Sequence, residues 1–357
     1  MNKEIYHIAP IFQRTSGVST FVGELANGQA SIGDKVTIAT LSQFVNEHYP
    51  VSESVNVVDV LKCLNLEEER PDIVHIHGIW TPVLHRIATL AVRIGIPLVW
   101  SPHGMLAPWA MRHKRWKKWP IWWLWQKRDL AKSSLIHATT DLEAEWIRNC
   151  GLRNDLVIVP LGTSMPKRLC DLKADKKVIL FVGRLYPVKG LENLIRAWGM
   201  IEAGKRQEWV LRIVGPDQAD YRGVLEKLVE RLQLGESVEF TGPKYGEDLN
   251  REYDKCECLT LPSFTENFGA TIVDALAHGK PCIASMFTPW KELQDRGCGW
   301  WVENEPETLS KAIMNMMNVG VEQRREMGER GRRLVEERYT WKAVVNVMER
   351  AYEGVMR

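Results

Sequence analysis

The stretch PSFTENFGATIVDALAHGKPCIAS, residues 262–285, decides the fold of this chain. An apolar strand, CLTL at 258–261, comes just before it. The stretch itself contains a helical pattern from about residue 267 to 277, with Gly279 as its stop, and ends in a second apolar strand, CIAS at 282–285. A strand, a helix and a strand in this order predict one unit of a parallel α/β sheet.

Two acids eight residues apart flank the start of this predicted helix. Glu266 stands just before it, and Asp274 lies two turns along. An open helix N-terminus can bind a phosphate, so both carboxylates could bind hydroxyls beside it. The alternative is that Glu266 only caps the helix and Asp274 only faces water. The backbone N–H groups expected at that terminus belong to Asn267, Phe268 and Gly269.

A second element upstream favours the ligand-binding interpretation. In VILFVGRLYPVKGLENLIRAW, residues 178–198, an apolar strand ends at Gly183 and is followed by Arg184 and Lys189, before a helix that begins near Gly190. This order places both cations at the carboxyl end of the strand, where open parallel sheets bind ligands.

Together the two segments resemble the GT-B fold glycosyltransferases of family 4, which use nucleotide-sugar donors and retain the anomeric configuration. The family signature is G-R-x-x-x-x-K-G followed by P-S-x-x-E-x-F-G-x-x-x-x-E-A-x-A-x-G-x-P, and this chain matches nearly every position. It departs at Asp274, where the family usually has Glu, so the ribose could be held differently. The resemblance implies that Glu266 binds hydroxyls of the transferred sugar and Asp274 those of the ribose.

Short apolar strands alternate with helical patterns along all 357 residues. This alternation predicts the α/β class with two Rossmann-like, doubly wound parallel-sheet domains, which in the GT-B fold face one another across an interdomain cleft. We expect an N-terminal acceptor-binding domain over 1–165 and a nucleotide-sugar-binding domain over 166–338. By the resemblance, a last helical segment at 339–357 packs back on the N-terminal domain.

Composition bounds the function classes. A formal net charge of +2 gives no reason to expect nucleic acid as a partner. The seven cysteines are odd in number and scattered, so we expect buried thiols in a reducing cytoplasm. Neither a secretory signal nor a membrane-spanning stretch is evident in the sequence.

Transfer from a sugar nucleotide requires stabilisation of a departing diphosphate. Many transferases use a metal held by Asp-x-Asp, but this sequence contains no Asp-x-Asp, so we expect neither a metal nor another cofactor. Arg184, Lys189 and the amides after Glu266 are expected to carry this role. Because no nucleophile is evident, we expect a front-face reaction, although a covalent intermediate stays open. The donor is expected to be a UDP- or GDP-sugar.

Two loops of the N-terminal domain should also contribute. Gly17 precedes a helix and could let a donor or acceptor approach the backbone, although a plain turn is the alternative. His103 follows the strand LVWS, and in similar enzymes a histidine at this point contacts the donor sugar. His77, in IVHIHGIW, has a similar location with weaker support.

The segment RHKRWKKWPIWWLWQKRDL, residues 112–130, combines seven basic residues with a cluster of tryptophans. Tryptophan and lysine or arginine favour the surface of an anionic membrane, which predicts a peripheral helix that contacts the inner leaflet or a lipid-linked acceptor. A packed core helix, a sugar-stacking groove and a nucleic-acid patch are the alternatives. The tryptophans are Trp116, Trp119, Trp122, Trp123 and Trp125.

These observations predict a metal-independent, retaining hexosyltransferase of polysaccharide or lipopolysaccharide assembly, cytoplasmic and peripheral at the inner face of the membrane. Its expected partners are a nucleotide-sugar donor, a lipid-linked glycan acceptor and the anionic membrane surface. Two alternatives stay open: a GT-B sugar-nucleotide epimerase or hydrolase, and a catalytically silent nucleotide-sugar-binding scaffold.

Overall fold

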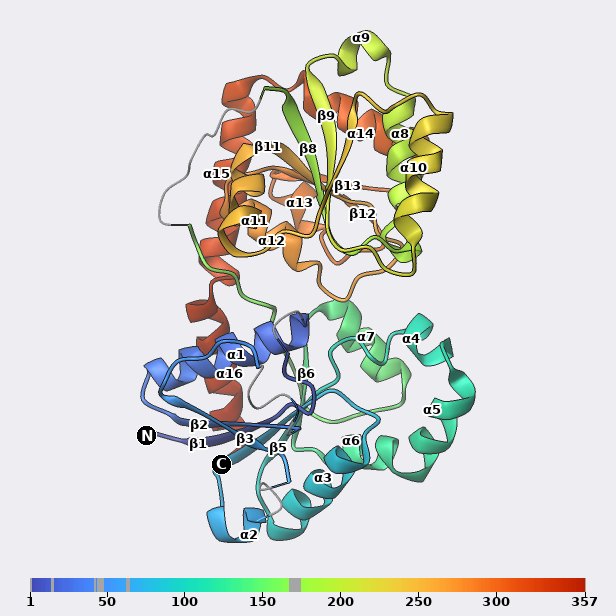
Figure 1. Ribbon diagram of the computed structural model, residues 1–357. Coiled ribbons are helices and arrows are strands. Elements are labelled where there is room, and N and C mark those ends of the chain that lie inside the picture. The colour runs from blue at the N-terminus through green and yellow to red at the C-terminus, as the bar shows by residue number, and fades with distance from the viewer. Residues whose placement is uncertain are drawn as a thin grey trace. The chain divides into compact units, whose positions relative to one another are not determined.

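Two parallel β-sheets organise the chain, one in each of two units (Figure 1). The computed structural model describes residues 2–13, 16–41, 43, 48–61, 65–166 and 175–356. The first unit is made of residues 1–162 and 341–357, and the second of residues 163–340. Cys63 and Cys170 lie outside the described residues.

The first unit is built on a seven-stranded sheet in the order β3-β2-β1-β4-β5-β6-β7, with parallel pairing throughout. Most of its strands are apolar and buried along nearly their whole length, as expected for a parallel sheet covered on both faces. The strands are β1 (Glu4–Ile8), β2 (Lys35–Thr40), β3 (Val55–Asp59), β4 (Ile73–His77), β5 (Leu98–Ser101), β6 (Leu135–Ala138) and β7 (Leu156–Ile158).

The helices of the first unit include the last helix of the chain, which packs against the first one. A Cβ added at Gly28 would lie 2.4 Å from a methyl group of Val345, so only glycine lets the two helices approach this closely. The helices are α1 (Gly17–Ser31), α2 (Leu66–Glu69), α3 (Pro82–Ile94), α4 (Pro108–Arg112), α5 (Arg115–Ile121), the π-helix η3 (Trp122–Gln126), α6 (Lys127–Lys132), α7 (Asp141–Asn149) and α16 (Trp341–Val355).

The second unit is built on a six-stranded parallel sheet in the order β10-β9-β8-β11-β12-β13. The strands are β8 (Lys177–Val182), β9 (Trp209–Val214), β10 (Val238–Gly242), β11 (Cys256–Leu261), β12 (Cys282–Ser285) and β13 (Gly299–Val302). Both sheets are parallel throughout, so the predicted α/β class with two doubly wound parallel sheets is confirmed.

Helices cover both faces of this second sheet, with α8, α10 and α14 on one face and α11, α12 and α15 on the other (Figure 1). Their bounds are α8 (Leu191–Gly199), α9 (Ala203–Arg206), α10 (Tyr221–Arg231), α11 (Gly246–Lys255), α12 (Ala270–Ala277), α13 (Glu292–Asp295), α14 (Pro306–Asn318) and α15 (Val321–Arg338). A short 3₁₀ turn, η4 (Pro187–Lys189), joins β8 to α8.

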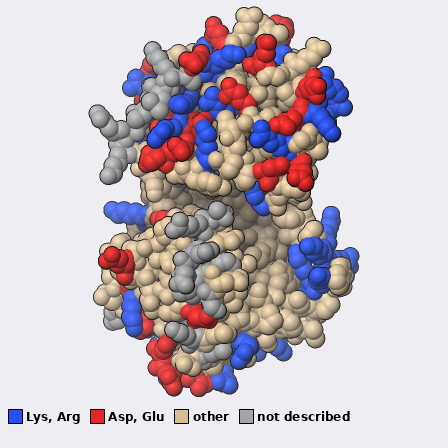
Figure 2. Space-filling model, viewed as in Figure 1, with Lys and Arg blue, Asp and Glu red and all other residues tan. Residues whose placement is uncertain are grey.

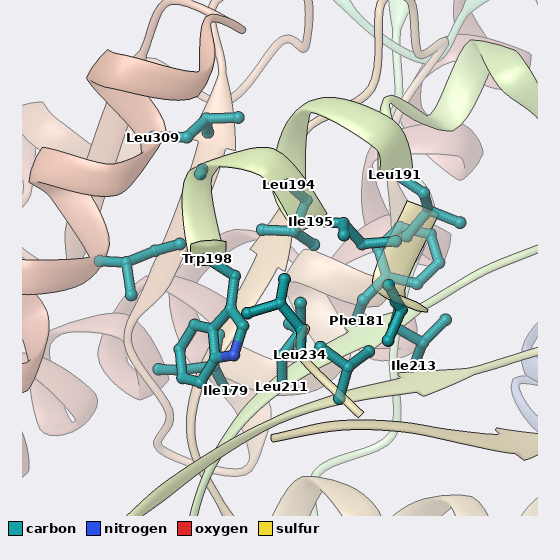
Figure 3. Close-up of a cluster of buried hydrophobic side chains, with 14 of the residues drawn as sticks. Ile179, Phe181, Leu191, Leu194, Ile195, Trp198, Leu211, Ile213, Leu234 and Leu309 are labelled. Atoms are coloured by element: carbon teal, nitrogen blue, oxygen red, sulfur yellow. The ribbon is translucent and has the colours of Figure 1, made fainter. Parts of the chain in front are cut away.

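The core of the second unit shows why α8 forms where it does (Figure 3). Its apolar residues recur at helical spacing and pack on the sheet, and the Trp198 indole N–H donates to Ser237 Oγ at 3.1 Å. Burying each such side chain stabilises the fold by about 1.5–3 kcal/mol. The helical stripe consists of Leu191, Leu194, Ile195 and Trp198.

The cysteines within the described residues are free thiols, and Cys256 and Cys258 are buried in β11 as expected of core thiols. No helix in this described part of the chain combines the length and the apolar character needed to cross a bilayer.

Candidate functional site

The order of strands in the second unit has a reversal point. From β8 the chain runs outward through β9 and β10, and then returns to place β11 on the other side of β8. Ligands of open α/β sheets bind outside the carboxyl ends of the strands at such a switch point. The loops that follow β8 and β11 carry three of the predicted site residues, Arg184, Lys189 and Glu266.

The loop after β8 holds Arg184 and Lys189. Arg184 is exposed and donates through Nη1 to Gln218 Oε1 at 3.1 Å. Lys189 ends the η4 turn and is followed by Gly190, whose φ is +70°. A Cβ at Gly190 would lie 2.0 Å from the Pro262 carbonyl oxygen, so glycine is required for the two loops to touch.

The loop after β11 holds Glu266, and the structure pairs this residue with Lys189. The Lys189 ammonium donates to Glu266 Oε1, and the Ser263 hydroxyl donates to the same oxygen at 2.9 Å. The two side chains are only 16% and 13% exposed. Backbone bonding joins the loops as well, because the Phe264 amide donates to the Val188 carbonyl at 2.8 Å. Two residues predicted from separate motifs therefore form one partly buried ion pair.

The predicted start of the following helix was wrong. α12 begins at Ala270, not at Asn267, because Gly269 adopts a left-handed φ of +84° and acts as the N-cap. The amides of Asn267, Phe268 and Gly269 consequently lie in the loop, and the first turn of the helix presents those of Ala270 and Thr271 instead.

The Phe268 side chain is also not placed for ligand binding. It is 5% exposed and packs against the rings of Trp290 at 5.3 Å and Tyr339 at 5.9 Å. Its carbonyl accepts from the Trp290 indole N–H at 2.5 Å. Phe268 therefore anchors the loop in the core of the unit.

Asp274 lies on α12 and is partly buried. Its Oδ1 accepts a hydrogen bond of 2.6 Å from the hydroxyl of Thr163. Burial raises the pKa of this carboxyl, while the Thr163 hydrogen bond and the nearby His278 lower it. The carboxylate is therefore already held by the protein, which the sequence pattern did not reveal.

In the first unit the corresponding reversal point lies between β1 and β4. Gly17 is the first residue of α1, and among the described residues no atom outside its chain neighbours and its own helix backbone lies within 4 Å of where its Cβ would be. Arg14 and Thr15, just before it, lie outside the described residues.

His103 follows β5 in a tight turn. Its φ of +52° and that of +74° at Gly104 are both left-handed, which is strained for a histidine. The Gly104 amide donates to the buried Glu143, which also accepts from the Thr139 amide at 2.8 Å. The His103 ring contacts His77, with 3.0 Å between Nε2 and Nδ1. The two histidines considered from the sequence thus meet.

Three further histidines join this pair, and sequence reasoning missed them. His7 and His75 are register partners on β1 and β4, and His137 lies on β6. Each interrupts an apolar strand, and His75 and His77 share one face of β4 because they are two residues apart. A polar residue recurring inside buried parallel strands was the available signal.

Ring nitrogens of His7, His75 and His77 lie within 4.8 Å of one another, a spacing that a metal ion could bridge. All six nitrogens of these three rings already have protein hydrogen-bond partners. A cation would have to displace these bonds, so the arrangement fits a hydrogen-bonded network better than a metal centre.

The tryptophan-rich segment divides into two faces. Trp116, Trp119 and Trp123 are 74%, 44% and 64% exposed. The expectation for the other two was wrong: Trp122 is 6% exposed in the core, and Trp125 is partly buried and stacks on His85 at 5.5 Å. The reason is the π-helix η3, whose wider turn changes which residues share a face.

Lys and Arg side chains gather on the surface over α4 and α5 (Figure 2). The Arg115 guanidinium lies 4.2 Å from the centre of the Trp119 ring, and the Lys117 ammonium 4.8 Å from that of Trp116. A shallow open hollow on this surface is lined by Arg112, Lys114, Arg115, Trp116 and Trp119.

Comparison with protein families gives two matches that together span most of the chain. Residues 16–162 match the family described as glycosyl transferase 4-like domain, and residues 170–334 match the family described as glycosyl transferases group 1.

Among curated proteins, the chain is 31% identical over 198 residues to an uncharacterized glycosyltransferase of Methanocaldococcus jannaschii, with 54% of this chain and 49% of that protein covered. It is 26% identical over 235 residues to D-inositol 3-phosphate glycosyltransferase of Actinosynnema mirum, with 60% and 56% covered. The chain spans about half the length of the curated relatives it matches.

Solved structures are similar over nearly the whole chain. Sucrose-phosphate synthase from Thermosynechococcus elongatus has a TM-score of 0.79 at 19% identity, with 99% of both chains covered. HepE of Anabaena in complex with UDP and glucose has 0.76 at 17% identity, with 99% of this chain and 100% of that chain covered. WaaG, a glycosyltransferase involved in lipopolysaccharide biosynthesis, has 0.74 at 15% identity, with 98% and 99% covered. Likeness at these identities shows the shared fold alone.

Proposed function

Because the chain belongs to the glycosyl transferases group 1 family, we propose that it transfers a sugar from a nucleoside diphosphate sugar, with retention at the anomeric carbon and without a metal ion. The observation that carries this proposal is the Lys189–Glu266 pair at the reversal point of the second sheet, where Lys189 lies on the same loop as Arg184. HepE of Anabaena, of similar fold, binds UDP and glucose, which supports a UDP-sugar as the first donor to test.

In the proposed reaction the bond between the anomeric carbon and the diphosphate oxygen breaks, and a bond to the acceptor hydroxyl oxygen forms on the same face. The acceptor proton passes to the departing phosphate oxygen, so atoms and charge balance. Lys189 and Arg184 stabilise the negative charge that develops on the diphosphate. Glu266 accepts hydrogen bonds from sugar hydroxyls, and Asp274 from the ribose.

The Lys189–Glu266 pair has a role before the donor arrives. A partly buried ammonium without a partner is costly, and Glu266 provides this partner at the sheet edge. When a diphosphate binds, its oxygens offer Lys189 a second acceptor, while the carboxylate is oriented by Ser263 as well. Preorganisation of this kind is typically the largest catalytic contribution.

A thermal-shift screen of UDP-, GDP-, ADP- and dTDP-sugars tests the donor proposal. A donor present at about 100 times its dissociation constant should stabilise the protein by about 2.7 kcal/mol. Absence of stabilisation by all four would refute the donor assignment. Turnover that EDTA abolishes and manganese restores would refute metal independence.

We further propose that the acceptor is a lipid-linked glycan of lipopolysaccharide or exopolysaccharide, reached from the inner membrane surface. The exposed tryptophans among basic residues on α5 and η3 support this, since each lysine or arginine near anionic lipid contributes about 1 kcal/mol. WaaG, of similar fold, acts in lipopolysaccharide biosynthesis.

Adjacent tryptophans provide a matched test of membrane contact. Trp123→Ser removes an exposed ring and should weaken binding to vesicles containing anionic lipid while the protein stays folded. Trp122→Ser removes a buried ring and should lower stability instead. Cosedimentation of Trp123→Ser with anionic vesicles at the wild-type level would contradict the proposal.

A further inference from the structure

Five histidines of the first unit, His7, His75, His77, His103 and His137, form two hydrogen-bonded chains. Burial lowers the pKa of His7 and His137 to about 4 and that of His103 to about 3. Burial, followed by repulsion between the rings, also takes the pKa of His75 and His77 well below its ordinary value. All five are therefore neutral near pH 7. A neutral imidazole has one N–H donor and one bare acceptor nitrogen. If the group at one end of a chain of such rings can only accept, the donor and acceptor roles of every hydrogen bond in the chain are fixed.

The first chain begins at Glu349 on α16. Its two carboxylate oxygens accept from the Lys3 ammonium and, at 2.9 Å, from the amide nitrogen of Gln29. The amide oxygen of Gln29 therefore faces His7, whose Nε2 lies 2.8 Å away. Because this oxygen can only accept, His7 carries its proton on Nε2.

The proton position on His7 then fixes the tautomer of each following ring. The bare Nδ1 of His7 accepts from Nε2 of His77 at 2.9 Å, and the bare Nδ1 of His77 accepts from Nε2 of His103 at 3.0 Å. Nδ1 of His103 is left bare, and among the described residues it has no hydrogen-bond partner. His103 is also partly exposed, whereas His7 and His77 are at most 3% exposed.

The second chain is closed at both ends. Nε2 of His137 lies 2.7 Å from the carbonyl oxygen of Val159, which can only accept, so His137 carries its proton on Nε2. Its bare Nδ1 therefore accepts a hydrogen bond from the Ser101 hydroxyl at 2.6 Å. Ser101 accepts from His75 Nε2 at 2.6 Å, and the Tyr352 hydroxyl donates to His75 Nδ1 at 2.6 Å. The side chains that this chain joins are all buried, and each of their ring nitrogens and hydroxyls has a hydrogen-bond partner within the protein.

We propose that Gln29, His7 and His77 are positioning residues that hold His103 in one tautomer, with a bare Nδ1 offered as a hydrogen-bond acceptor. The ligand group that this nitrogen takes must carry a proton, such as a hydroxyl, and an anionic phosphate oxygen is excluded. That the hydroxyl belongs to a sugar rests on the proposed function.

The backbone around His103 supports a fixed orientation. The left-handed turn is held by Glu143, whose carboxylate accepts from the Gly104 amide on one oxygen and from the Thr139 amide on the other. The Phe21 ring contacts the His103 ring edge-on at 5.4 Å. The ring is therefore constrained from both its backbone and its face.

Nitrogen NMR of the full chain labelled with ¹⁵N-histidine tests the proposal, because protonated and bare ring nitrogens have well-separated shifts. At pH 7 the wild-type protein should show His7, His77 and His103 each with a protonated Nε2 and a bare Nδ1. A protonated Nδ1 on His103 would overturn the proposal. The spectrum needs neither donor nor acceptor, so its result is independent of whether transfer is detected.

Two variants separate this role from ordinary packing. Gln29→Met keeps the side-chain length but removes the acceptor for His7, so a second tautomer should appear at His103. Ser101→Ala cuts the closed chain at an equally buried position and should leave the His103 tautomer unchanged. An unchanged His103 in Gln29→Met, or a changed one in Ser101→Ala, would contradict the assigned direction. Gln29→Glu retains an acceptor and should keep the wild-type pattern.

Discussion

The reversal points of the two sheets differ in how they treat charge. In the second unit the loops after β8 and β11 bring together a lysine and a glutamate that form a partly buried ion pair. In the first unit, strands β1 and β4 and the turn after β5 bring together imidazole rings. Burial lowers the pKa of these rings, so they are neutral. A buried charge needs a partner of opposite sign, and the histidines have only one another and neutral groups at close range.

This difference suggests a division of labour in the proposed transfer. Negative charge develops on the diphosphate, and fixed cations stabilise it best. Hydroxyl groups need acceptors whose direction is set, and a neutral imidazole in one tautomer provides this without attracting anions.

The largest effect is expected from Lys189→Ala. Loss of a preorganised donor to the leaving diphosphate should lower turnover by at least about a hundredfold, measured as initial rates with saturating donor. It also leaves Glu266 unpaired in a partly buried site, so the stability of the second unit should fall in urea unfolding.

Lys177→Ala is the matched control for this variant. Lys177 forms an ion pair with Glu208 at 2.9 Å in the same unit, but the two side chains are 43% and 76% exposed. An exposed pair contributes only about 0–1 kcal/mol, so turnover and stability should stay near wild type. Equal effects of the two variants would remove the distinction between the Lys189–Glu266 pair and a surface ion pair.

Acidification should weaken the first unit selectively. The unfolded chain binds protons on its histidines near pH 6.5, whereas folded His7 binds one only near pH 4, so stability is lost as the pH falls through this window. At pH 5, about 1.5 units below the ordinary value, His7 alone accounts for about 2 kcal/mol, or roughly 30-fold in protection from hydrogen exchange.

The two units provide their own control in this experiment. Of the nine histidines only His278 lies in residues 163–340. Between pH 7 and pH 5, amides of β4 should lose protection after correction for intrinsic exchange, while those of β8 should keep theirs. Equal losses in both strands would mean that the histidines do not cause the pH dependence.

The strands and the residues of the charged pair could be predicted from the sequence for physical reasons. Apolar runs bounded by turn residues mark buried parallel strands, and Arg184, Lys189 and Glu266 all follow the ends of such runs. What brings Lys189 to Glu266 is the adjacency of β8 and β11 in the sheet.

The features that were missed depend on backbone detail or on register. α12 starts late because Gly269 is left-handed, and two tryptophan rings turn inward because η3 is a π-helix. The first histidine chain requires β1 to pair with β4, so that His7 reaches His77 across two strands that are far apart in sequence. Helical and strand periodicity give no information on any of these three points.

The smallest effect is expected at Asp274. Like Glu266 it is an acid, but like the histidines its hydrogen-bond partner is a neutral group, the hydroxyl of Thr163. Thr163→Val removes the hydroxyl that donates to its carboxylate at 2.6 Å and should raise its pKa further, because the ionised form loses a hydrogen bond. If the ionised form accepts from the ribose, donor affinity should fall by about fivefold, the value of a hydrogen bond of about 1 kcal/mol. Thr163→Ser keeps the hydroxyl and should bind the donor as wild type does in isothermal titration. Wild-type affinity in Thr163→Val would mean that Asp274 has a structural role and does not bind the donor. Donor binding in this unit would then depend on Lys189, Arg184 and Glu266 without Asp274.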